Sequence, residues 1–212
     1  MNLAKYDTVI LDCDGVVFDT NILKVEAFSK TFEELGFDKV YIDKFVAYMK
    51  NNFGVSRYKF AEYFIKNILK RELDTRLYEN IIDIYSKKSY ELYFEAEFTE
   101  NLLEFLEFYK GKRVFIASGS KEDELKEVFK HRKIDRYFQA IYGSPKKKDE
   151  IVGAIARECN NCIMIGDSRS DMIAAKNAKI DFIFMYDYSI SSEMINNKNL
   201  ISIKNLGDLV EK

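Results

Sequence analysis

The chain of 212 residues is 47% hydrophobic and 32% charged, which is enough apolar material to build a core and excludes an intrinsically disordered protein. Its 33 Lys and Arg residues against 35 Asp and Glu residues give a formal net charge of -2, so it offers no broad basic surface for nucleic acid. No apolar run reaches the ~20 residues of a membrane helix, and three cysteines are too few for a disulfide framework, so we expect a cytoplasmic protein without a membrane span or structural disulfides.

The first predicted strand, residues 8–11, is followed by a long stretch in which no further strand is indicated. Apolar side chains there recur three or four positions apart and share helical faces: Phe28, Phe32 and Leu35; Phe60, Phe64 and Ile68; Leu77, Ile81, Ile84 and Tyr85. The stretch holds 16 of the 31 Phe and Tyr residues, which is enough for a core of its own. We therefore predict about four helices in an inserted all-helical domain of residues 21–95, and a core domain of residues 1–20 and 96–212.

From residue 113 onward, short apolar runs alternate with segments of helical spacing. The runs occupy residues 113–117, 139–142, 162–165 and 181–185, and residues 200–212 read as a short strand and a helical turn. This alternation predicts an α/β fold with a Rossmann-like parallel sheet and helices on both faces. Ligands of such sheets bind at the carboxyl ends of the strands, so functional residues are expected directly after the apolar runs.

Two acidic pairs stand at such positions. Asp12 and Asp14 follow the first run and precede Gly15, which permits a sharp turn, and Asp167 and Asp171 follow the run at 162–165. A single Asp after a strand is commonly a helix N-cap, but four at two strand ends would repel one another unless a cation lies among them. An oxygen-rich site of this kind suits a hard divalent ion, and Mg2+ is the metal we predict.

A hydroxyl and a cation follow two further runs. Ser118 and Gly119 come after residues 113–117, where a hydroxyl and free backbone N–H groups at a helix start could hold phosphate oxygens; a simple N-cap is the alternative reading. Three lysines at 146–148 follow the run at 139–142 and could balance a site rich in carboxylates, although such a run is usually a solvated helix start. Lys146 and Lys148 both fit.

These motifs, in this order, resemble those of the haloacid dehalogenase superfamily of phosphotransferases. The family's first motif is Asp-x-Asp-Gly, its second a Ser or Thr after a strand, its third a Lys, and its fourth Gly-Asp-x-x-x-Asp. In this chain the matching residues are Asp12, Asp14, Gly15, Ser118, Lys146 or Lys148, Gly166, Asp167 and Asp171. Relatives that read Gly-Ser-Pro-x-x-Lys favour Lys148. The helical insertion is similar to the cap domain of the subgroup that includes phosphoglycolate phosphatase and β-phosphoglucomutase.

The resemblance implies a mechanism. Asp12 would attack phosphorus and form an aspartyl-phosphate, and Asp14 would act as the general acid and then the general base. Mg2+ would be held by the side chains of Asp12 and Asp167 and the backbone carbonyl of Asp14, with Asp171 bound to the metal directly, through its water or to the site lysine. Ser118, Gly119 and Lys148 would bind the phosphoryl oxygens. The expected function is hydrolysis of a small phosphorylated metabolite of the sugar phosphate or phosphoglycolate type, by a monomer or a homodimer.

By the same resemblance, two residues of the helical insertion are candidates for substrate binding. Residues 53–57, Phe-Gly-Val-Ser-Arg, are similar to a loop of β-phosphoglucomutase in which the arginine contacts the substrate's other phosphate, so Arg57 is a candidate. The mutases carry a histidine where this chain has Lys24, a second candidate, and the only histidine, His131, lies outside residues 21–95. This favours a hydrolase. A phosphoglucomutase-like phosphotransferase and a non-catalytic phospho-acceptor or binding module are the alternatives.

The three cysteines invite other interpretations. Cys159 and Cys162 have the Cys-x-x-Cys spacing, but no second pair accompanies them and Cys162 opens a predicted strand, so neither metal nor redox chemistry is expected. Cys13 lies between Asp12 and Asp14, where alternation turns its side chain away from theirs, and we expect it in the core.

Overall fold

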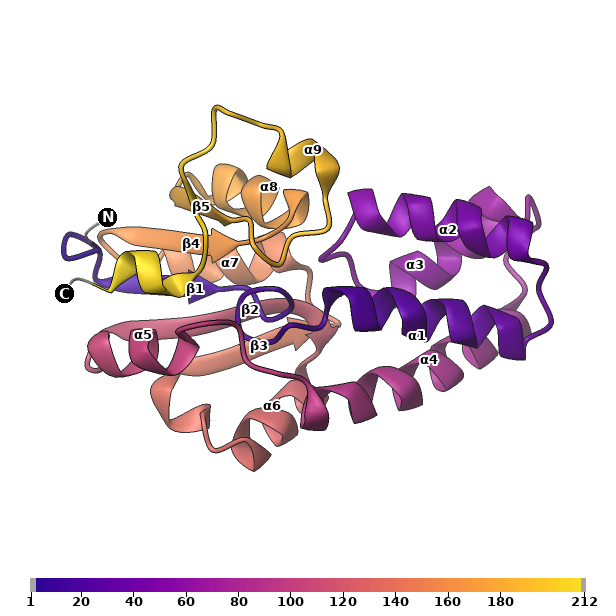
Figure 1. The fold of residues 1–212 in the computed structure, drawn as a ribbon, viewed down its shortest axis with the longest axis horizontal. Coiled ribbons are helices and arrows are strands. Elements are labelled where there is room, and N and C mark those ends of the chain that lie inside the picture. The colour runs from indigo at the N-terminus through magenta and orange to yellow at the C-terminus, as the bar shows by residue number, and fades with distance from the viewer. Residues whose placement is uncertain (1–2, 211–212) are drawn as a thin grey trace.

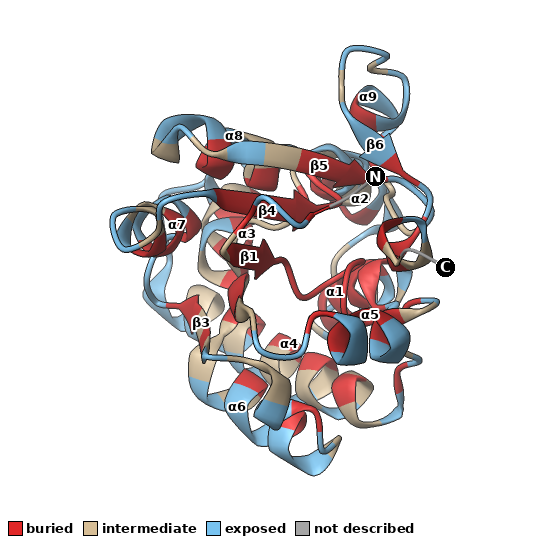
Figure 2. Ribbon diagram, turned by 90° about the vertical axis from the view of Figure 1, so that its left-hand side faces the viewer, coloured by how far each residue is buried: buried red, intermediate tan, exposed pale blue. Residues whose placement is uncertain are grey.

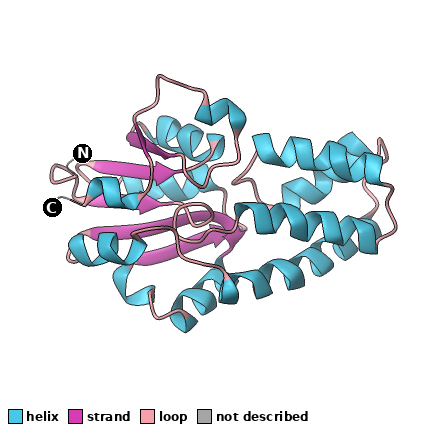
Figure 3. Ribbon diagram, viewed as in Figure 1, coloured by secondary structure: helices cyan, strands magenta, loops and turns pink. Residues whose placement is uncertain are grey.

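A computed structural model describes residues 3–210 as a parallel sheet flanked by helices, with a group of helices at one end (Figures 1 and 3). The strands are β1 (Thr8–Leu11), β2 (Arg113–Lys121), β3 (Ala140–Ser144), β4 (Cys162–Gly166), β5 (Asp181–Met185) and β6 (Ser202–Ile203). The helices are α1 (Asn21–Glu34), α2 (Lys39–Asn51), α3 (Arg57–Tyr63), α4 (Thr75–Glu95), α5 (Leu102–Phe108), α6 (Glu122–His131), α7 (Lys148–Ala156), α8 (Arg169–Ala178) and α9 (Ser192–Ile195). Short turns of other helix types occupy Phe64–Ile68, Asp135–Tyr137 and Leu206–Leu209. The predicted fold class is confirmed.

The strand order is β3-β2-β1-β4-β5-β6, and every pair is parallel. The chain builds the sheet outward from β1 in one direction with β2 and β3, and in the other with β4, β5 and β6. The boundary between β1 and β4 is therefore a topological switch point, where the loops after the two strands diverge and leave a crevice for a ligand. Leu11 of β1 pairs with Ile165 of β4, so Asp12 and Asp167 follow their strands at nearly the same level.

Both faces of the sheet are covered, as the apolar runs predict. Val9 and Leu11 point into a core completed by α5 and α6, whereas Ile10 points into a second core completed by α7 and α8. This alternation buries β1 and β4 along their whole length (Figure 2). The middle of the sheet is therefore rigid, and side chains that follow β1 and β4 are held by a fully packed scaffold.

Helices α1 to α4, residues 21–95, are called here the helical module. They lie beyond the carboxyl ends of the strands and pack around a third apolar cluster that draws its buried members from residues 25–85 (Figure 1). Aromatic rings dominate this cluster: Phe28 stacks on Tyr85 with ring centroids 3.7 Å apart, and Phe32 stacks on Phe64 at the same distance. The helical spacing of these residues in the sequence is thus explained by packing within the module.

Two features differ from the sequence-based expectation. Strand β2 continues to Lys121 instead of ending at residue 117, and its pairing with β3 is irregular between Ala117 and Lys121. Cys159 and Cys162 form a disulfide, contrary to the prediction of no structural disulfide, because the turn between α7 and β4 brings their Cα atoms to 6.0 Å, within the range a disulfide can span. Cys13 is buried in the core, as expected.

No helix in residues 3–210 is both long and apolar enough to cross a membrane.

Candidate active site

Three carboxylates converge at the switch point of the sheet. Asp12 follows β1, Asp167 follows β4 and Asp171 lies in the first turn of α8, and one oxygen from each lies within 4.8 Å of the other two. All three residues are at most 1% exposed. Asp12 Oδ2 and Asp167 Oδ1 have no hydrogen-bond partner, although both atoms are buried. Unpaired carboxylate oxygens are costly to bury, so this cluster is built for a cation.

The local backbone brings these groups together. Gly15 has φ +76°, a conformation that side chains rarely adopt, and a Cβ there would lie 2.5 Å from Asp167 Oδ2. The same Asp167 oxygen accepts a hydrogen bond of 2.5 Å from Asn21 Nδ2. Asp171 is held by a capping box at the start of α8, in which the Ser168 hydroxyl and backbone N–H donate to its Oδ2 at 2.5 Å and 3.0 Å.

Lys148 supplies the one cation in contact with this cluster among the described residues. Its ammonium lies 2.9 Å from Asp12 Oδ1 and 2.5 Å from Asp171 Oδ1, and its side chain is buried. Burial lowers the pKa of Lys148, but the charges of Asp12 and Asp171 outweigh burial and raise the pKa overall. Lys146, the other lysine that fits the third motif, is exposed and lies over the ring of Tyr142.

One lysine does not balance three carboxylates. Burial, and then the charge of Asp171, raise the pKa of Asp12 to about 7 against the opposing effect of Lys148. Burial and the charge of Asp12 likewise raise the pKa of Asp167 well above its usual range. Oxygen ligands with unsatisfied charge are the donor set of a hard divalent cation, so the residues present fit such an ion. A divalent ion would neutralise the excess negative charge of the carboxylates, which adds to burial in raising the pKa values of Asp12 and Asp167.

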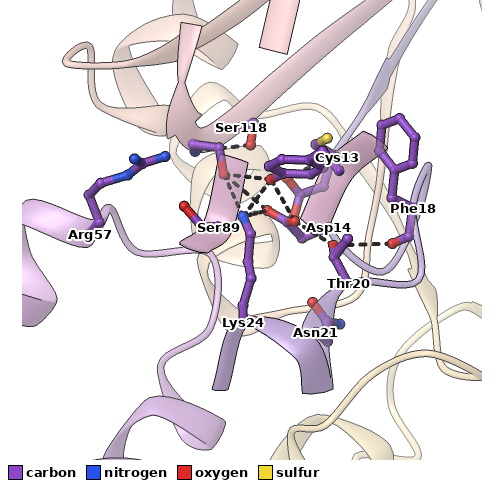
Figure 4. A network of polar contacts seen from close by, with 12 residues as sticks. Cys13, Asp14, Phe18, Thr20, Asn21, Lys24, Arg57, Ser89 and Ser118 are labelled. Carbon is purple, nitrogen blue, oxygen red and sulfur yellow. Dashed lines mark hydrogen bonds and ion pairs between the residues drawn. The ribbon is translucent and has the colours of Figure 1, made fainter. Parts of the chain in front are cut away.

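The side chain of Asp14 lies outside this cluster, in a separate buried network (Figure 4). It accepts hydrogen bonds from Thr20 Oγ1 at 2.5 Å, Lys24 Nζ at 2.6 Å, Tyr93 Oη at 2.8 Å and Ser120 Oγ at 3.2 Å. Burial raises the pKa of Asp14, but the charge and hydrogen bond of Lys24 and the two hydroxyl donors Thr20 and Tyr93 outweigh it and lower the pKa overall. The network holds Asp14 ionised and fixed.

Lys24 reaches this network from α1 of the helical module. It is only 5% exposed, and its ammonium also donates to Tyr93 Oη and Ser120 Oγ at 2.5 Å and 2.6 Å. Tyr93 and Thr20 were not singled out from the sequence, because nothing distinguishes one tyrosine among 14 or a threonine six residues after Asp14. Only the fold brings them to the same carboxylate.

Ser118 and Gly119 lie within the extended end of β2. Ser118 is fully buried, and its hydroxyl accepts a hydrogen bond of 3.1 Å from the backbone N–H of Ser120, so it does not cap a helix. A Cβ on Gly119 would lie 2.6 Å from the backbone oxygen of Gly54, which places the loop between α2 and α3 directly on this strand end. The loop also lies against Lys148: a Cβ on Gly54 would be 3.2 Å from its ammonium.

Arg57, at the start of α3, points toward the sheet domain but is already paired. Its guanidinium lies 2.6 Å from Glu124 Oε2 of α6 and donates to the Ser86 hydroxyl at 2.7 Å. The helical module thereby closes over Asp14 and leaves a cavity of about 20 Å³, enough for about one water molecule. In this closed arrangement the cavity beside Asp14 is too small for a phosphorylated metabolite.

A Rossmann-like sheet with buried carboxylates at its switch point is the arrangement of an α/β protein whose ligand site could hold a cation. The chain belongs to the haloacid dehalogenase-like hydrolases, whose family model matches residues 9–185, and the predicted family is confirmed. The phosphoglycolate phosphatase of Aquifex aeolicus (strain VF5) is 22% identical over 184 residues, which cover 80% of each protein. A hydrolase from Pseudomonas syringae shares the fold with TM-score 0.75 and 16% identity over 93% of both chains. CbbY from Rhodobacter sphaeroides in complex with phosphate shares it with TM-score 0.74 and 16% identity over 96% of both chains.

Proposed function

We propose that this protein is a Mg2+-dependent phosphatase that hydrolyses a small phosphorylated metabolite through an aspartyl-phosphate intermediate. The observation that carries the proposal is the convergence of Asp12, Asp167 and Asp171 on one buried point beside Lys148, with two carboxylate oxygens left unpaired. Membership of the hydrolase family and the relative named phosphoglycolate phosphatase support it.

The metal would be held by the side chains of Asp12 and Asp167 and the backbone carbonyl of Asp14, with Asp171 close enough to bind it directly or through a water molecule. When bound, Mg2+ offsets the negative charge of the phosphoryl oxygens and of the carboxylates around them.

The proposed chemistry starts at Asp12. One of its carboxylate oxygens attacks phosphorus; its Oδ1 accepts from the backbone N–H of Cys13 at 2.7 Å and faces Lys148. This step requires the protonated form of Asp14, which its network in this structure disfavours: as the new bond forms, the ester P–O bond breaks and Asp14 gives that proton to the departing oxygen. Water then attacks the phosphorus of the aspartyl-phosphate, Asp14 takes the water proton, and the bond to Asp12 breaks to release phosphate.

The phosphoryl oxygens would be held by three groups on the sheet side of the site. Lys148 supplies a buried ammonium, Ser118 a hydroxyl and Gly119 a backbone N–H. Ser118 and Gly119 come from β2, which pairs with β1, and Lys148 comes from the start of α7 and reaches Asp12 at the end of β1. Positioning and charge neutralisation are the main contributions to phosphoryl transfer, and a fully buried scaffold supplies both.

The helical module, residues 21–95, would act as a cap domain on a core domain of residues 1–20 and 96–212. Its own apolar cluster and its two crossings to the sheet are consistent with movement as a unit. In the closed arrangement of this structure the module presents Lys24 and Arg57 toward the cavity. Closure over a substrate would exclude bulk water during the reaction.

The test is hydrolysis of p-nitrophenyl phosphate with and without Mg2+. We expect release of nitrophenol that is abolished by a chelator and by Asp12→Asn, while the control Asp43→Asn, which changes an exposed aspartate of α2, retains wild-type activity. Unchanged activity of Asp12→Asn would overturn the proposal.

A further inference from the structure

The cavity between the helical module and the sheet contains two buried cations, and each already has a carboxylate partner. Lys24 is paired with Asp14 at 2.6 Å, and Arg57 is paired with Glu124 at 2.6 Å. Much of the remaining lining is apolar or aromatic, from Met49, Phe53, Phe60 and Tyr85. A cavity with this lining has no net charge to offer the part of a substrate that lies beyond the phosphoryl group.

Arg57 determines whether this cavity can accept an anionic substrate tail, because a free guanidinium there would bind one. Its side chain is 3% exposed and both terminal nitrogens donate to Glu124, at 2.6 Å and 3.3 Å, in a two-pronged ion pair. Burial lowers the pKa of Arg57, but Tyr85 and Glu124 outweigh burial and raise it. The carboxylate comes from α6, on the sheet side, so the pair also links α6 to the helical module when the cavity is closed.

We propose that Glu124 is a specificity-determining residue that selects phosphate esters with an uncharged, hydroxylated tail over those with an anionic tail. The inference rests on the proposed phosphatase function and concerns the same site. A neutral tail leaves the pair between Glu124 and Arg57 intact as the module closes. A carboxylate or second phosphate must displace Glu124, which then keeps only its looser contact with Lys121 at 3.9 Å, or lie beside it, and either arrangement places two negative charges beside one buried guanidinium.

The selectivity is measured with two substrates that differ only in the tail: phosphoglycolate, which carries a carboxylate, and 2-hydroxyethyl phosphate, which carries a hydroxyl in its place. The quantity is the ratio of kcat/KM for phosphoglycolate to kcat/KM for 2-hydroxyethyl phosphate. A substitution that only destabilises the fold lowers kcat/KM for both substrates by the same factor and leaves the ratio unchanged. The ratio therefore separates a role in specificity from a structural role.

We expect Glu124→Gln to raise this ratio at least tenfold, because Arg57 is then free to bind the carboxylate. Arg57→Gln, which removes the close partner of Glu124 and leaves only Lys121 at 3.9 Å, should instead lower the ratio at least threefold. The matched control is Glu127→Gln, which removes the same charge from the next turn of α6 at an exposed residue that hydrogen-bonds Tyr90 of the helical module and does not line the cavity. The control should leave the ratio within twofold of the wild-type value.

An unchanged ratio in Glu124→Gln, or a wild-type ratio above one, would overturn the role of Glu124 while leaving the proposed function in place. Hydrolysis of p-nitrophenyl phosphate by the wild-type protein reports that function separately, and its absence would overturn both proposals. If Glu124→Gln does not fold, the opposite shift predicted for Arg57→Gln decides the question.

Discussion

Replacing Asp12 with Asn removes one charge from a buried cluster in which three carboxylates face one lysine. In the metal-free protein the pKa of Asp12 is raised from 3.8 to about 7, mainly by burial. A carboxyl whose pKa is raised on folding binds more protons in the folded state than in the unfolded state between these two values. The free energy of unfolding therefore falls as the pH rises from about 4 to about 7.

The size of the loss follows from the two pKa values of Asp12. They differ by about 3 pKa units, and each unit corresponds to about 1.4 kcal/mol, so ionising Asp12 costs the metal-free fold about 4 kcal/mol above pH 7. The asparagine side chain of Asp12→Asn cannot ionise, keeps similar volume and still accepts the hydrogen bond from Cys13. The free energy of unfolding of Asp12→Asn should therefore not fall by this amount as the pH rises.

The assay is urea unfolding of both proteins at pH 4 and pH 8 in the presence of a chelator. We expect the free energy of unfolding of the wild-type protein to fall by about 4 kcal/mol more than that of Asp12→Asn between the two pH values. Saturating Mg2+ at pH 8 should stabilise the wild-type protein but not the variant. Parallel pH dependence of the two proteins, or a larger loss in the variant, would refute the reasoning.

Three further predictions concern single side chains. Lys148→Met leaves two carboxylates of the cluster without their cation, so the metal-free protein should lose about 3–5 kcal/mol of stability at pH 8 in urea; equal stability would contradict the assignment. Lys24→Met removes the charge that outweighs burial at Asp14, so the limb of the pH profile of kcat that reports Asp14 should move to higher pH, and an unmoved limb would argue against this role. Gly54→Ala places a Cβ 2.2 Å from the Ser170 hydroxyl and should lower kcat/KM about tenfold, whereas Gly36→Ala, with a similar φ and no atom within 4 Å of its Cβ, should not; equal effects would contradict a role for this loop in closure.

Much of the sheet could be predicted from the sequence. The runs at 8–11 and 181–185 match β1 and β5 to the residue, because strands that are buried on both faces over most of their length leave a mainly apolar run. The meeting of Asp12 with Asp167 could be predicted for the same reason, since parallel topology places both strand ends at one edge. The extension of β2 to Lys121 could not, because Ser-Gly-Ser has no apolar period and its pairing with β3 is irregular.

The side chains that face one another across the helical module and the sheet could not be predicted. Lys24, Tyr93 and Glu124 lie on three different helices, and of the three only Lys24 is singled out, by the family resemblance and not by a local pattern. Their contacts depend on how the helical module closes on the sheet, which no local pattern records. The Cys159–Cys162 disulfide was also missed, because the cysteine count and spacing carry no information on the turn that brings the two residues together.

The most direct test of the central claim is borohydride trapping of the wild-type protein during turnover of p-nitrophenyl phosphate, followed by mass spectrometry of its peptides. Borohydride reduces an aspartyl-phosphate to homoserine. The account predicts homoserine at position 12 when substrate and Mg2+ are both present, and none when a chelator replaces the metal. An enzyme that turns over substrate and yields no homoserine at position 12, or yields it at another aspartate, would contradict the account.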